Sequence, residues 1–163
     1  MHGKRELDEQ MTQICIQENY KDKYIEYLTC FLSGTSGSAE ESAACVAEMG
    51  FDQSVLDACI DDLDEEYNVT GMYNDKSTWL SGNFPQFNVY KDLTTLYEVR
   101  GSPSFVINEQ SISTGRSPAA LLSTICSGFE NPPEECNQEI STETPGPGFG
   151  MEGTGSATAA TCG

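Results

Sequence analysis

The sequence predicts an α+β fold in which a disulfide-stapled helical part precedes a proline-led strand, a β-hairpin and a C-terminal helix. Apolar residues recur at helical spacing over 7–63, and each predicted helix there holds one cysteine. A short β-branched run follows a proline in the second half. We therefore expect a helical part at 1–67, a mixed part at 68–140 and a disordered tail at 141–163.

Four short helices are predicted in the first part. The first has an apolar stripe between Leu7 and Cys15, and the second repeats that spacing over 24–31. The third runs over about 39–49, and the fourth begins near 52. Four helices with one cysteine in each apolar stripe favour a compact antiparallel unit.

The strand and its neighbours are the most legible part of the chain. The pattern predicts a strand over 104–107, a turn at 108–110 and a return strand over 111–113. Ser117 is a suitable N-cap, and Pro118 fits the first position of the helix that follows. From Ser141 onward the chain is rich in Gly, Pro, Ser and Thr, which predicts a segment that buries too little surface to fold.

Charge and hydropathy exclude several kinds of partner. The net charge is −18, so we expect no binding to nucleic acid. No apolar run approaches the roughly 18 residues that a membrane helix requires, and we expect no membrane segment. The N-terminus also lacks the apolar core of a signal peptide.

Seven cysteines predict disulfides, and hence an oxidising, extracytoplasmic compartment that is secreted, periplasmic or at the cell surface. Close Cys/His pairs, which a metal site needs, are missing from the sequence, so we expect neither a metal nor another cofactor. Antiparallel neighbouring helices favour nested bridges in the first part. The expected pairs are Cys30–Cys45, Cys15–Cys59 and Cys126–Cys136, with Cys162 unpaired.

The order of these features resembles a known family. The segment "LYEVRGSPSFVINEQSISTGRSPAALLSTIC" is similar to the C-terminal half of thioredoxin-like domains of the DsbA-like group. The N-terminal "MHGKRELDEQMTQIC" resembles the gamma-interferon-inducible lysosomal thiol reductase branch. The resemblance covers about 2–136 and implies an incomplete α/β thioredoxin-like fold, with 1–67 as a helical insertion and 68–140 as the C-terminal half.

The resemblance also implies a substrate-binding loop. Ser102–Pro103 would be the cis-proline loop, with Ser102 closest to the catalytic thiols and Ser104 offering its backbone to an extended polypeptide or thiol substrate. The alternative is that Pro103 is an ordinary trans residue that starts a strand.

One departure from the family decides the functional hypothesis. The Cys-x-x-Cys pair that performs catalysis in the family is missing, so no catalytic residue is assigned, and we expect an N-terminally truncated chain. The main hypothesis is a thiol–disulfide oxidoreductase domain that is inactive alone. The alternatives are a non-catalytic extracytoplasmic peptide-binding module and a structural module stabilised by disulfides. An open sheet edge or Cys162 would favour dimers or aggregates.

Overall fold

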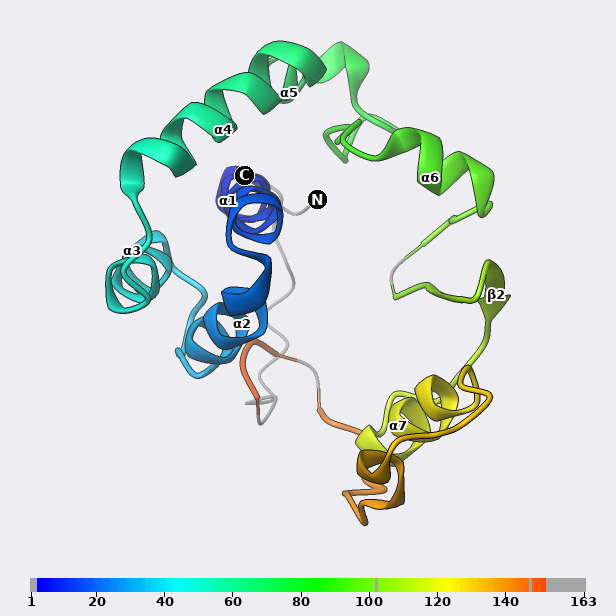
Figure 1. The fold of residues 1–163 in the computed structure, drawn as a ribbon. Coiled ribbons are helices and arrows are strands. Elements are labelled where there is room, and N and C mark those ends of the chain that lie inside the picture. The colour runs from blue at the N-terminus through cyan, green and yellow to red at the C-terminus, as the bar shows by residue number, and fades with distance from the viewer. Residues whose placement is uncertain (1–2, 102, 147, 152–163) are drawn as a thin grey trace. The chain divides into compact units, whose positions relative to one another are not determined.

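The structure, a computed structural model, describes residues 3–101, 103–146 and 148–151. These residues form two compact units (Figure 1). The helical unit holds the described residues up to Val89 together with 148–151, and the hairpin unit runs from Tyr90 to Gly146. Helices and one two-stranded antiparallel sheet confirm the broad α+β prediction.

The helical unit contains the four predicted helices and one more. A fifth helix was not predicted, and it begins after Asn68, whose left-handed backbone (φ 49°) separates it from the fourth. In the first turn of this fifth helix, the backbone N–H of Thr70 donates a hydrogen bond to the carboxylate of Asp64 at 2.6 Å. The helices are α1 (Lys4–Asn19), α2 (Tyr24–Leu32), α3 (Ala39–Glu48), α4 (Gln53–Tyr67) and α5 (Val69–Asn74), with 3-10 turns at Lys21–Lys23 and Lys76–Thr78.

The predicted apolar stripes form the core of this unit. Leu7 and Cys15 of α1 are fully buried, as is Tyr27 of α2. The Tyr27 hydroxyl lies 2.8 Å from Glu9 Oε1 and 2.8 Å from Ser42 Oγ, so a buried polar group joins α1, α2 and α3. Burial raises the pKa of Tyr27 strongly, which keeps the hydroxyl protonated as a donor to Glu9.

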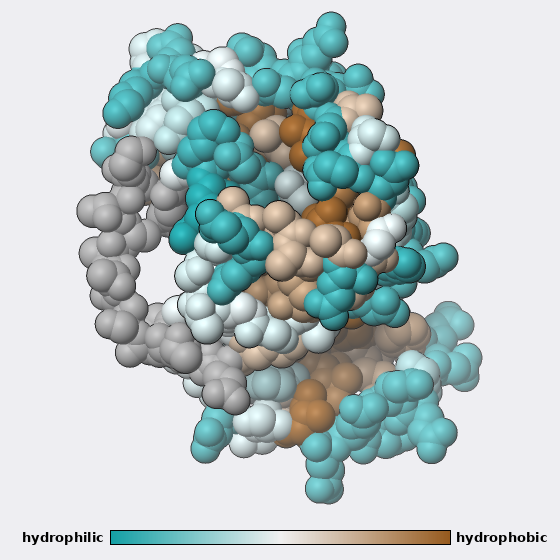
Figure 2. Space-filling view, turned by 90° about the vertical axis from the view of Figure 1, so that its left-hand side faces the viewer, coloured by the Kyte–Doolittle hydropathy of each residue, from teal (hydrophilic) through white to brown (hydrophobic). Residues whose placement is uncertain are grey.

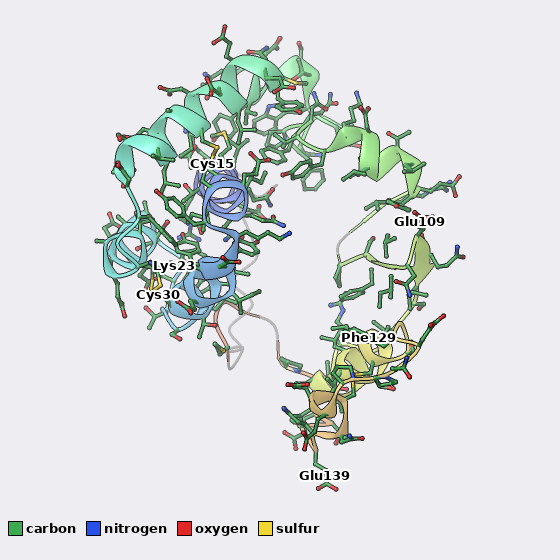
Figure 3. All side chains as sticks on the ribbon, in the orientation of Figure 1. Cys15, Lys23, Cys30, Glu109, Phe129 and Glu139 are labelled. Atoms are coloured by element: carbon green, nitrogen blue, oxygen red, sulfur yellow. A yellow bond between two sulfur atoms is a disulfide. The ribbon has the colours of Figure 1, made fainter. Side chains whose placement is uncertain are left out.

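Three disulfides join the cysteines in the predicted pairs. Cys15–Cys59 ties α1 to α4, and Cys30–Cys45 ties α2 to α3, so the two bridges are nested (Figure 3). Their sequence separations of 44 and 15 correspond to about 4 and about 3 kcal/mol in the chain-entropy model. Cys126–Cys136 lies in the hairpin unit.

The last part of the helical unit is anchored by an aromatic side chain. Trp79 is buried, and its indole N–H donates to the carbonyls of Met72 and Tyr73 at 3.2 and 3.0 Å. Val89 is also buried in the core cluster. Trp79 and Val89 therefore attach the segment after α5 to the helical unit.

The hairpin unit contains α6 (Lys91–Leu96), β1 (Phe105–Ile107), β2 (Gln110–Ile112), α7 (Pro118–Cys126) and a 3-10 turn at Glu134–Asn137. The predicted antiparallel pairing is confirmed, with Val106 opposite Ser111 and Ile107 opposite Gln110. The expected three-residue turn was wrong. Asn108 and Glu109 both adopt positive φ, which closes the hairpin in two residues and leaves Gln110 in β2.

Hydrophilic side chains cover much of the side on which α3 and α4 lie, with hydrophobic residues visible between them (Figure 2). Helices in the described part of the chain are all too short or too polar to cross a membrane.

A single carboxylate organises the loop between α2 and α3. Glu41 accepts the backbone N–H groups of Thr35, Ser36 and Ser38 at 2.9 to 3.2 Å, and the Ser38 hydroxyl caps α3 in return. These hydrogen bonds, led by that from the Thr35 backbone, lower the pKa of Glu41 to about 2. The ionised form of Glu41 therefore holds this loop.

We predict that the loop loses this support in acid. Because the folded-state pKa of Glu41 is depressed, its contribution is complete above the ordinary glutamate pKa and is lost as pH falls toward 2. The amide proton shifts of Thr35, Ser36 and Ser38 should titrate together with a midpoint near pH 2 in an NMR titration. Glu41→Gln should abolish this titration. A midpoint at the ordinary glutamate value would contradict the assigned hydrogen bonds.

Candidate functional site

A groove of about 520 Å³ lies beside the hairpin. Its walls come from the segment 97–101, from both strands, and from the residues on either side of the hairpin. The Ser111 hydroxyl of β2 donates to the carbonyl of Tyr97 at 3.3 Å, which holds the segment 97–101 next to the sheet. The groove therefore lies where a strand, a proline and a loop meet.

Two of the three predicted substrate-binding residues line this groove. Pro103 and Ser104 are exposed on its wall, and the Ser104 hydroxyl donates to the carbonyl of Gly101. Ser102 lies outside the described residues, and with it the predicted cis bond to Pro103. Pro103 and Ser104 are thus accessible on the groove wall.

The outer edge of β1 is open among the residues that the structure describes. In a hairpin closed by a two-residue turn, the flanking pair Ile107 and Gln110 exchanges both ladder hydrogen bonds. The next pair, Val106 and Ser111, does not, so the N–H and C=O of Val106 point away from β2. The sheet has two strands, which leaves these groups free to pair with an added strand.

The apolar residues of the hairpin unit are incompletely covered. No described residue between Tyr90 and Gly146 is buried, and all three residues of β1 are half-buried. Ile125 and Phe129, on or just after α7, remain 51 and 50% exposed. The half-buried residues of β1 are therefore ones that an added strand would help to cover.

Sequence reasoning missed the basic residues of the groove. Arg100 and Arg116 both line it, together with Glu98. These two arginines and Lys91 are the three basic residues of the chain after Val89. Their positions on either side of the predicted hairpin in an acidic chain were a usable signal. Two guanidinium groups give the groove hydrogen-bond donors suited to carboxylates or backbone carbonyls.

None of the cysteines that the structure describes has a free thiol. All six that the structure describes are in disulfides, and Cys162 lies outside the described residues. Cys15 is fully buried and Cys45 nearly so. The predicted pairs thus stabilise the two units, and none of these sulfurs is a thiolate that could start disulfide exchange.

Within the described residues, no group of three or more His, Cys, Asp or Glu side chains is arranged to hold a metal ion. His2 lies outside those residues.

Comparison of the chain with models of protein families, with curated proteins and with solved structures finds no match.

Proposed function

We propose that this chain is an extracytoplasmic, disulfide-stabilised module that accepts an extended polypeptide strand at the outer edge of β1. The observation that carries the proposal is the unpaired backbone of Val106 beside the exposed Pro103 and Ser104. Main-chain hydrogen bonds to an added strand supply affinity in this mode of recognition, and side-chain pockets supply selectivity. The groove beside the hairpin, which Val106 also lines, offers Arg100 and Arg116 to such a ligand.

The proposal includes a relation to thioredoxin-like oxidoreductases of the DsbA-like group. The order of Pro103, β1, the hairpin and α7 matches the order that the resemblance implies. In that family the loop before the strand meets extended substrates. This chain would retain the substrate-binding edge without a redox pair, because its sequence has no Cys-x-x-Cys.

The three disulfides support an oxidising location for the module. They tie α1 to α4, α2 to α3 and α7 to the turn that follows it. A bridge that is needed for stability would be lost in a reducing compartment.

We predict that the chain does not reduce insulin. Exchange needs an accessible thiolate and, for turnover, a resolving thiol, and six of the cysteines are bonded to each other. Insulin precipitation with dithiothreitol should proceed at the rate of the protein-free blank, with an intact Cys-x-x-Cys thioredoxin as the positive control. Activity that survives Cys162→Ser would contradict the proposal, since it would require a redox pair among the bridged cysteines.

We predict that Val106→Pro weakens strand addition by about tenfold, because it removes the outward N–H and leaves the ladder hydrogen bonds to β2 in place. The probe is a fluorescein-labelled heptapeptide of alternating threonine and valine, and binding is followed by fluorescence anisotropy. The matched control is Ser111→Pro measured against Ser111→Ala: both lose the hydroxyl that donates to Tyr97, and only the proline variant loses the N–H, which points to the opposite edge of the hairpin.

Ser111→Pro should bind the peptide as Ser111→Ala does. A loss from Ser111→Ala to Ser111→Pro as large as that caused by Val106→Pro, or no binding by the unmodified chain, would contradict the proposed use of the β1 edge. Peptide mapping of Cys126–Cys136 in each variant checks that the hairpin unit is folded.

A further inference from the structure

A short segment near the C-terminus returns to the helical unit. The ring of Phe149 lies 5.2 Å from the ring of Phe31 in an edge-to-face arrangement with an interplanar angle of 77°. The segment 148–151 lies beside α2 (Figure 1). An edge-to-face aromatic pair stabilises the folded state in addition to the stabilisation that comes from burying its apolar area.

The slot that holds Phe149 exists because one wall lacks a side chain. Gly37, in the loop between α2 and α3, has φ +62°, and a Cβ there would lie 2.6 Å from a ring carbon of Phe149. Any other residue at this position would displace the ring. Glu41 holds the backbone of the same loop from Thr35 to Ser38, so the slot has a preformed wall.

The backbone directly after Phe149 also contacts the end of α2 and the loop that follows it. Gly150 has φ +94°, and a Cβ there would lie 3.2 Å from the carbonyl oxygen of Leu32 and 3.3 Å from that of Gly34. The Met151 N–H donates to the Leu32 carbonyl at 3.1 Å. Leu32 is the last residue of α2, so its carbonyl has no hydrogen-bond partner within the helix. The returning segment therefore helps to cap α2.

We propose that the helical unit carries a peptide-binding site for a Gly-Phe-Gly segment, and that the chain's own segment 148–151 is its resident ligand. The site requires an aromatic ring to fill the slot and favours a glycine directly after it, where φ is positive and two carbonyl oxygens would crowd a side chain. Gly-Phe also occurs at Gly50-Phe51 and Gly128-Phe129, but neither pair is followed by glycine.

The site is accessible to a segment from outside. Phe149 is only partly buried, and a hollow of about 720 Å³ lies beside it, lined by Phe31 and by polar residues of α1 that include Arg5 and Glu9. A ligand in trans can therefore approach while the resident segment leaves. This site lies within the helical unit and is independent of the proposed function of β1.

The test opens the slot and offers the segment as a free peptide. The full chain is used in a Cys162→Ser background, with and without Phe149→Ala, and the probe is the fluorescein-labelled peptide TPGPGFGMEG. The Phe149→Ala chain should bind this peptide at least about tenfold more tightly than the chain with Phe149, because the resident segment competes at high effective concentration. A peptide with alanine in place of its phenylalanine should not bind.

Two glycine variants separate the slot from general backbone strain. Gly37→Ala and Gly50→Ala both place a side chain at positive φ (+62° and +67°), but nothing lies within 4 Å of the added Cβ at Gly50. In the Phe149→Ala chain, Gly37→Ala should abolish peptide binding and Gly50→Ala should retain it. Trp79 fluorescence reports whether the helical unit is folded in each variant.

Three results would overturn the inference. The first is a folded Phe149→Ala chain that does not bind the peptide, and the second is equal binding with Gly37→Ala and Gly50→Ala. The third is a dimer of the unmodified chain that Phe149→Ala dissociates in sedimentation velocity, because the resident segment would then come from a second copy.

Discussion

Short helices must bury their apolar stripes against one another, because helices of this length are marginal alone in water. In the helical unit α1 packs against α4 and α2 against α3, and a disulfide joins each pair. Tyr27 sits fully buried between them, with its hydroxyl bonded to Glu9 and Ser42. This mutual burial makes the helical unit a stable base in a chain whose net charge of −18 opposes compaction.

The hairpin unit does not bury its apolar residues in this way. Its strands have three residues each, a length at which an isolated hairpin is marginal, and none of its described residues is buried. Cys126–Cys136 and the hydrogen bond from Asn108 to the Gly128 carbonyl hold α7 and the hairpin in place. An added strand at β1 would supply the missing burial, which is why we connect the open edge with binding.

Residues whose role is set by local chemistry could be predicted from the sequence. The apolar stripe of α1 and the N-cap at Ser117 follow from periodicity and capping. The long-range pairing of Cys15 with Cys59 could also be predicted, because antiparallel helices that each hold one cysteine favour nested bridges. Other residues whose role depends on distant partners could not be predicted. Arg100 and Arg116 line one groove only when the hairpin forms, and Phe149 fits its slot only because Gly37 leaves space. The helix after Asn68 was missed because its boundary depends on one left-handed residue.

Residue-resolved hydrogen exchange by NMR tests the central claim most directly, because it reports whether the outer edge of β1 is free. The Val106 amide should exchange faster than that of Ile107, which donates to β2, and it should become protected when the threonine–valine heptapeptide is added. A Val106 amide that is already protected in the free chain, or one that the heptapeptide leaves unchanged, would contradict the account.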